Sequence, residues 1–166
     1  MKPRCGCCSS PIVGHSDSNA AQDTGYLHVT YDHDLFQNVD AGPRVRFGRV
    51  HVFSSFFDHV TYYAVASTMN ASVLVEKNYL SSVTAAGLDP AYGPVTTDLP
   101  GSDAPGFVDL VGNYADASSA PDAIMTGQTN SWTPPYIYMS DAAPTARAIT
   151  VQCAGPRAVG TAAPAN

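Results

Sequence analysis

Short segments rich in apolar, aromatic and β-branched residues recur along the chain, and clusters of turn-forming residues separate them. The clearest examples are residues 26–31, 44–53, 60–67 and 72–77. Residues 44–53 alternate with the period of two of a strand that buries one face, whereas 60–67 has apolar residues on both faces, as expected for an interior strand or one in an interface. No segment shows a sustained period of 3.6 residues. The pattern therefore predicts an all-β protein with negligible helix.

Two pairs of these segments predict antiparallel hairpins. Residues 60–67 and 72–77 flank a short turn, and residues 136–139 and 147–153 flank the turn-like residues 141–145. Long polar stretches lie between the pairs. We therefore expect a single antiparallel β-sandwich, jelly-roll or Ig-like, with long loops.

The segment 44–53 changes its pattern at Gly48. Apolar residues occupy odd positions before Gly48 and even positions after it, so a β-bulge at this glycine would restore the register. The bulge would place Arg44, Arg46 and Arg49 in one basic stripe together with His51. This stripe is interpreted either as a solvated outer face or as a partner-binding surface.

The ends of the chain lack a core-forming pattern. We expect an extended N-terminal arm over 1–24, the sandwich over 25–153 and an extended tail over 154–166. The arm and the basic stripe are the predicted partner-binding residues: Cys5, Cys7, Cys8, Ile12, Val13, Arg44, Arg46 and Arg49.

The N-terminal cysteines do not have the spacing of common structural zinc sites, so no metal is expected. Whether Cys5, Cys7 and Cys8 form disulfides or bind a soft metal with His15 stays open. Cys153, by contrast, falls on the same side of its predicted strand as Ile149 and Val151, which indicates a small buried hydrophobe.

Charge limits the classes of partner. The chain has a net charge of −6 with 13% charged residues, which argues against nucleic acid. No apolar run is long enough to cross a bilayer, and no hydrophobic stretch follows the basic start, so neither a membrane partner nor a secretory signal is expected. The sparse charge favours a homo-oligomer.

No catalytic signature is evident, and neither catalytic residues nor a cofactor are expected. Ser54, Ser55, Asp58 and His59 are close in sequence, but a triad is defined by spatial geometry. The loop aromatics Tyr79, Tyr92 and Trp132 could form a glycan-binding platform. Alternatively, Trp132 packs over one edge of the sandwich.

The order of elements resembles that of accessory β-sandwich proteins of tailed-phage virions. The resemblance rests on the strand pair 60–67 and 73–77, a long loop, and the closing pair 135–139 and 148–151. It implies a non-enzymatic capsid decoration or head-tail component, made in the host cytoplasm and bound to other virion subunits. The alternative is a carbohydrate-binding, receptor-recognition module that uses the loop aromatics.

Overall fold

The computed structural model describes residues 10–84, 93–119, 129 and 132–155. Within these residues the strands form three parallel sheets, which we call A, B and C. Sheet A contains β1 (Ile12–Val13), β4 (Arg44–Arg46), β7 (Val65–Thr68) and β10 (Val95–Thr96). Sheet B contains β2 (His28–Asp32), β5 (Arg49–Phe53), β8 (Ser72–Glu76) and β11 (Phe107–Val111). Sheet C contains β3 (Leu35–Ala41), β6 (Phe56–Tyr63), β9 (Tyr79–Ser81) and β12 (Tyr114–Ala115).

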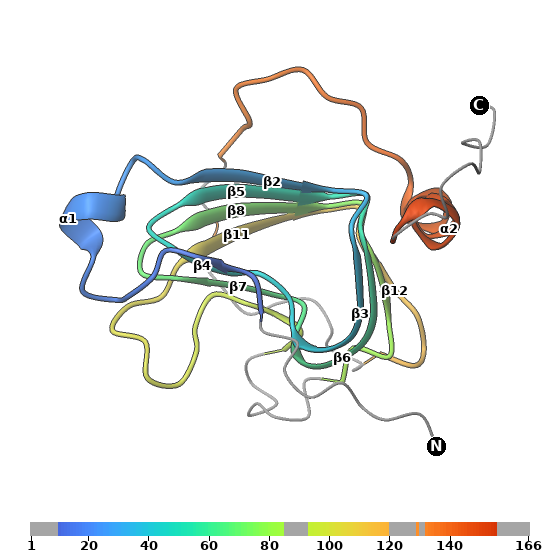
Figure 1. The fold of residues 1–166 in the computed structure, drawn as a ribbon, viewed down its shortest axis with the longest axis horizontal. Helices are drawn as coiled ribbons and strands as arrows, with labels where there is room; N and C mark the ends of the chain where they lie inside the picture. The colour runs from blue at the N-terminus through green and yellow to red at the C-terminus, as the bar shows by residue number, and fades with distance from the viewer. Residues whose placement is uncertain (1–9, 85–92, 120–128, 130–131, 156–166) are drawn as a thin grey trace.

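Successive strands belong to different sheets, so the chain coils instead of turning back (Figure 1). β2, β3 and β4 make one turn of the coil, and β5, β6 and β7 make the next. The turns are stacked in parallel: Val50 pairs with Val29 on one side and with Val73 on the other. The architecture is a parallel β-helix.

Inward-facing side chains of all three sheets fill the coil. Val45 of sheet A, Val50 of sheet B and Phe57 of sheet C are each 0% exposed. Phe36 stacks on Phe57 with ring centroids 4.7 Å apart, so like residues lie above one another in successive turns. Burial of each such side chain stabilises the fold by about 1.5–3 kcal/mol. The outward positions are free to differ between sheets.

A stacked two-residue corner joins sheet B to sheet C. In each turn the first corner residue has a positive φ: His33 (54°), Ser54 (49°), Lys77 (49°) and Gly112 (60°). The second is polar, and Asn78 shows its role. The Asn78 side chain accepts from the Ser55 N–H and donates to the Val52 carbonyl, both at 2.9 Å. The Asn113 side chain accepts from the Asn78 N–H at 2.9 Å, so these amides satisfy the corner backbone from turn to turn.

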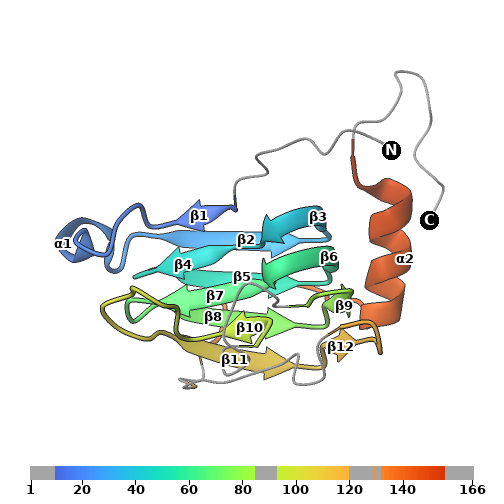
Figure 2. The ribbon, with the colours of Figure 1, turned by 90° about the horizontal axis from the view of Figure 1, so that it is seen from below.

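The described residues also include two helices outside the coil. The short α1 (Ala20–Asp23) follows β1, and α2 (Ala143–Cys153) packs beside sheet C (Figure 2). Ala143, Ala146 and Thr150 form the buried side of α2, and Pro144 occupies its first turn, where its missing N–H has no helical partner to lose. None of the helices in the described residues is long and apolar enough to span a membrane.

Residues 132–142, which we call the strap, lead to α2 across the outer face of sheet B (Figure 1). The Tyr136 hydroxyl lies 2.8 Å from Thr30 Oγ1 and 2.9 Å from His51 Nδ1. The Asp141 N–H donates to Ser54 Oγ at 2.8 Å. The strap thereby covers His51, which is 0% exposed.

The predicted antiparallel sandwich is wrong. Residues 60–67 and 72–77 do not form a hairpin, because β6, β7 and β8 belong to sheets C, A and B in turn. A strand that buries one face has the same period-two pattern in a sandwich and in a β-helix. The alternation therefore located strands without giving their partners.

Two finer predictions fail for related reasons. The pattern shift at Gly48 reflects a corner between β4 and β5, where Phe47 has a φ of 59°, and not a bulge within one strand. The predicted second hairpin is also absent: residues 143–153 form α2, with Cys153 half-buried at its end, and 136–139 lie in the strap. The alanines of this segment favour helix.

Candidate functional site

β4 presents two arginines on the outer face of sheet A. Because Val45 points into the coil, alternation along the strand turns Arg44 and Arg46 outward. Their partners on β7 are the small residues Ala66 and Thr68. The outer side of β4 is therefore occupied by two guanidinium groups, in a chain whose net charge is −6.

Arg46 is held by the segment that follows β1. Its Nε donates to the Asp17 carboxylate, and its Nη1 donates to the Gly14 carbonyl at 3.1 Å. The residue is only 9% exposed, and a charge buried to this extent requires a partner. Arg46 and Asp17 are therefore a structural ion pair that fixes β4.

Arg44 has fewer partners. Its Nη2 donates to Ser102 Oγ at 2.8 Å and lies 3.9 Å from Asp17 Oδ1. Among the described residues, no group bonds its buried Nε. Burial lowers the pKa of Arg44, and the charge of Arg46 lowers this pKa further, while Asp17 raises it. Because Asp17 already bonds Arg46, Arg44 retains the capacity to bind another anion.

Gly42, two residues before Arg44, is in close contact with the backbone that follows β6. The Gly42 N–H donates to the Tyr63 carbonyl at 2.8 Å, and a Cβ at Gly42 would lie 2.0 Å from the Ala64 oxygen. Only glycine fits there. The rings of Tyr62 and Tyr63 lie 5.2 Å apart at the end of β6, and both lie near Arg44. Aromatic side chains therefore lie close to the arginines.

We call Arg44, Arg46, Asp17 and Ser102 the arginine face. A guanidinium binds a carboxylate through two parallel N–H donors, which lysine cannot do. With two cations and one carboxylate, the arginine face favours an anionic ligand. Its chemistry fits a carboxylate group held by Arg44.

The described residues contain no candidate metal centre. Across residues 10–84, 93–119, 129 and 132–155, no three histidine, cysteine, aspartate or glutamate side chains are grouped to hold an ion. Cys5, Cys7 and Cys8 lie outside the described residues.

The structure brings together part of the predicted partner-binding set. Ile12 and Val13 form β1, which pairs with Arg44 and Val45 of β4. Arg49 begins β5 and so belongs to sheet B. The predicted basic stripe is thus divided between two sheets.

The predicted aromatic platform is not assembled. Tyr79 lies on sheet C, with its ring 5.6 Å from Phe56 and 5.0 Å from Tyr114, and the Arg147 guanidinium lies 5.1 Å from its centroid. Trp132 lies over sheet B, where its backbone N–H donates to the Asp109 carboxylate at 3.1 Å. Tyr92 is outside the described residues.

Sequence reasoning missed Asp17 and Ser102, which lie far from β4 in sequence. A signal for the fold was present, however, in the recurrence of an apolar strand, a short polar corner and a further apolar strand. It appears at 31–36, 52–57, 75–80 and 110–115. The first three copies begin 21 and 23 residues apart, and the fourth begins 35 residues after the third. Such recurrence, with one longer connection, indicates a stacked repeat architecture, and that architecture would have placed Arg44 and Arg46 on an outer face.

Comparison with known proteins identifies the family. The profile described as pectate lyase matches residues 8–158. The chain belongs to the pectate lyase family. It is 34% identical over 119 residues to the probable pectate lyase B of Aspergillus flavus, which covers 71% of this chain and 34% of that protein. It is 44% identical over 71 residues to pectate lyase B of Colletotrichum gloeosporioides, covering 42% of this chain and 22% of that protein.

A solved structure agrees with this membership. Pectate lyase Bsp165PelA from Bacillus sp. N165, in complex with trigalacturonate, superposes with a TM-score of 0.72 at 31% identity. The match covers 84% of this chain and 43% of that enzyme. The chain thus spans less than half the length of these pectate lyases.

Membership of the pectate lyase family corrects several predictions. The resemblance to tailed-phage accessory proteins is wrong, because the family match and the solved relative are pectate lyases. The virion location, the virion-subunit partners, the expected homo-oligomer and the non-enzymatic structural role fail with it. The alternative receptor-recognition module is likewise not supported, because the relatives are polysaccharide-cleaving enzymes.

Proposed function

We propose that this chain binds a galacturonate-containing polysaccharide on the arginine face and takes part in cleaving it as a lyase. The proposal is supported by the family membership and by the relatives named pectate lyase. A further support is the relative solved with trigalacturonate. Each galacturonate unit has one carboxylate, the group that the arginine face is suited to hold.

The observation that most favours this site is the incomplete charge pairing of Arg44. Its side chain is 21% exposed and its Nη2 lies 3.9 Å from the Asp17 carboxylate, which is engaged by Arg46. The buried Nε is out of reach of a ligand, so a sugar carboxylate would bind at the Nη groups of the guanidinium. In an elimination, a base takes the proton from the carbon next to that carboxylate, a carbon–carbon double bond forms as the neighbouring C–O bond breaks, and the oxygen of the leaving sugar takes up a proton. A guanidinium on the carboxylate stabilises the negative charge that develops there.

The test is binding of polygalacturonate by calorimetry, combined with ultraviolet absorbance of the unsaturated product. We expect Arg44→Gln to weaken binding about tenfold or more, because a hydrogen bond to a charged group contributes about 1.5–3 kcal/mol. Arg44→Lys should recover only part of the affinity, since lysine keeps the charge without the two parallel donors.

Arg49→Gln is the matched control. It removes the same charge from an exposed position on sheet B and should leave binding nearly unchanged. Equal losses in Arg49→Gln and Arg44→Gln would show that the polymer responds only to overall charge. Binding without unsaturated product would retain the binding site and remove the proposed cleavage.

A further inference from the structure

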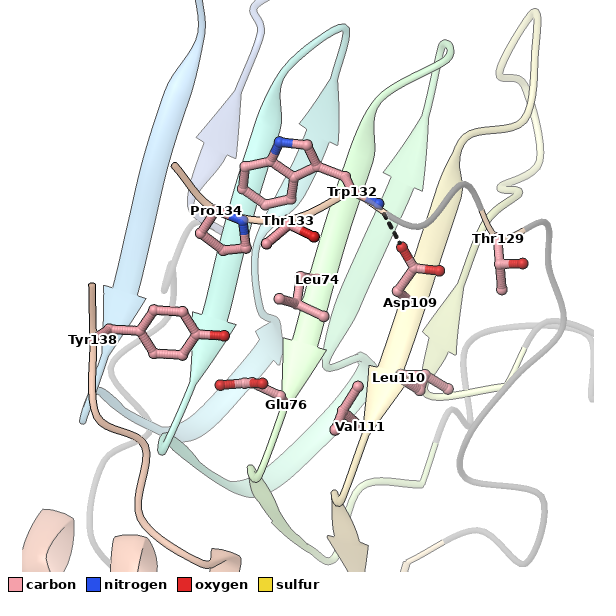
Figure 3. Close-up of a pocket in the computed structure, with 10 residues that line it drawn as sticks. All are labelled: Leu74, Glu76, Asp109, Leu110, Val111, Thr129, Trp132, Thr133, Pro134 and Tyr138. Atoms are coloured by element: carbon pink, nitrogen blue, oxygen red, sulfur yellow. Dashed lines mark hydrogen bonds between the residues drawn. The ribbon is translucent and has the colours of Figure 1, made fainter. Parts of the chain in front are cut away.

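The outer face of sheet B contains a second candidate site, distinct from the arginine face. A pocket of about 480 Å³ lies between this sheet and the start of the strap. Its floor and walls include Leu74, Glu76, Asp109, Val111, Trp132 and Tyr138 (Figure 3). This volume lies within the range of small-molecule sites.

The floor has a simple geometry. On the paired strands β8 and β11, Leu74 lies opposite Asp109, and Glu76 lies opposite Val111. The two carboxylates therefore occupy one diagonal of a four-residue patch, and the two apolar side chains occupy the other. From the spacing between strands and the rise along each strand, the Cα atoms at diagonal positions are roughly 8 Å apart.

Tyr138 and Trp132 contribute aromatic rings to the pocket. Figure 3 shows the Tyr138 hydroxyl directed toward Glu76, and the backbone N–H of Trp132 donating to Asp109. Burial raises the pKa of Tyr138, and the charge of Glu76 raises it further. Aromatic rings beside carboxylates are favourable surroundings for an organic cation.

No lysine or arginine of the described residues lines this floor. Glu76 is 7% exposed, and its Oε1 forms no hydrogen bond within the described residues. The nearest basic group is His51, with Nε2 at 3.5 Å from that oxygen. Burial lowers the pKa of His51 despite the opposing effect of Glu76, so the neutral imidazole is favoured. Arg49 and Lys77 are not among the residues that line the pocket.

We propose that this pocket binds a short aliphatic diammonium. One ammonium would contact Glu76, the other would contact Asp109, and the alkyl chain between them would cross Leu74 and Val111. A single metal ion fits less well, because calcium needs six to eight oxygens at about 2.3–2.6 Å and the described residues of the pocket offer two carboxylates. A galacturonate polymer is repelled by the same carboxylates.

The test uses the fluorescence of Trp132, the only tryptophan of the chain, with calorimetry as an independent measure. The probes are 1,4-diaminobutane, 1-aminobutane and the uncharged 1,4-butanediol, with calcium chloride as a fourth arm. We expect saturable binding of the diamine, at least tenfold weaker binding of the monoamine, and none of the diol. Added salt should weaken the diamine affinity.

Asp109→Asn is the decisive variant. It keeps an oxygen for the Trp132 N–H and removes one charge, so the diamine affinity should fall about tenfold, to the level of the monoamine. Glu76→Gln should do the same, with melting measured because it lies beside His51. Asp40→Asn, the same change at an exposed position of sheet C, should have no effect.

Four outcomes would overturn the proposal. These are no saturable signal by either method, binding of the diol as strong as that of the diamine, binding of calcium alone, and an equal loss of affinity in Asp40→Asn and Asp109→Asn.

Discussion

The outer faces of sheets A and B differ in charge although their inner faces are alike. Val45 on sheet A and Val50 on sheet B both point into the coil and are 0% exposed. Outside, sheet A presents two arginines against one carboxylate. The sheet B pocket presents Glu76 and Asp109. A stacked coil therefore fixes the interior while leaving each outer face free to acquire its own chemistry.

The difference also concerns access. On sheet A, Arg44 has a side chain that is 21% exposed. On sheet B the strap lies over His51 and Phe53, with the Tyr138 ring 4.6 Å and 5.2 Å from their rings. From their charges we expect the first face to attract a polyanion and the second face to repel one. The four substitutions below test whether the residues that stabilise one face can be changed without affecting the other face.

The largest effect is expected for Gly42→Ala, at the start of the arginine face. The new Cβ would lie 2.0 Å from the Ala64 oxygen and 2.9 Å from Phe57 Cε1, so the backbone must shift. We expect the free energy of unfolding to fall by about 3 kcal/mol, as measured by chemical denaturation. Gly25→Ala is the control: a Cβ there meets nothing within 4 Å, although its φ is 83°, so a loss near 1 kcal/mol from backbone strain alone is expected. Equal losses of unfolding free energy in the two variants would show that the contact between Gly42 and Ala64 is not as close as described.

Asn78→Ala should have the next largest effect, because it affects the corner between sheets B and C without touching sheet A. The change leaves the Ser55 N–H and the Val52 carbonyl without partners. Each unsatisfied buried group costs about 1–3 kcal/mol, so we expect a loss of about 2–3 kcal/mol. Gln22→Ala, which removes an amide group from an exposed position of α1, is the control. Loss of polygalacturonate binding in Asn78→Ala at a temperature where it stays folded would show that the faces are not independent.

The sequence predicted where strands lie but not how they associate. The alternation around Val50 and the apolar run around Val73 correctly indicated strands. The same alternation cannot distinguish an antiparallel neighbour from a parallel neighbour one turn away. The decisive information was the recurrence of a corner residue such as Ser55, Asn78 or Asn113, which aligns only when the repeats are compared.

The candidate site was predictable only in part. Arg44 and Arg46 were recognised as outward-facing because Val45 between them is apolar. Their partners Asp17 and Ser102 come from irregular segments that approach β4 only in the folded coil, so no local pattern indicates them. α2 was missed because the β-branched residues Ile149, Thr150 and Val151 favour strands locally, whereas Ala143, Ala146 and Thr150 bury one side of a helix against the coil.

A smaller effect is expected for Tyr136→Phe in the strap. The change removes the hydroxyl that bonds Thr30 Oγ1 and His51 Nδ1, while the ring is retained. We expect a loss of about 1 kcal/mol in the free energy of unfolding, together with faster amide exchange in the strap. Tyr26→Phe, at a position 77% exposed, should change neither quantity. Unchanged exchange in Tyr136→Phe would show that ring packing alone holds the strap.

The smallest effect is a pH dependence at the far end of the strap. His33 lies 2.9 Å from Asp141 of the strap and 2.5 Å from Asp32. Burial lowers the pKa of His33, but hydrogen bonds to these two carboxylates outweigh it, so the net pKa is raised above 6.5. The folded state therefore binds this proton more tightly than the unfolded state. The stabilisation is fully present below pH 6.5 and is lost as pH rises through the raised pKa. Because these groups are partly exposed, we expect the contribution to the free energy of unfolding to be less than about 1 kcal/mol.

His33→Asn should remove this component from a plot of unfolding free energy against pH. His28→Asn, which changes an exposed histidine of sheet B, should retain it. A profile of His33→Asn that parallels the unsubstituted protein would show that the strap end is held by the Ser54–Asp141 contact alone.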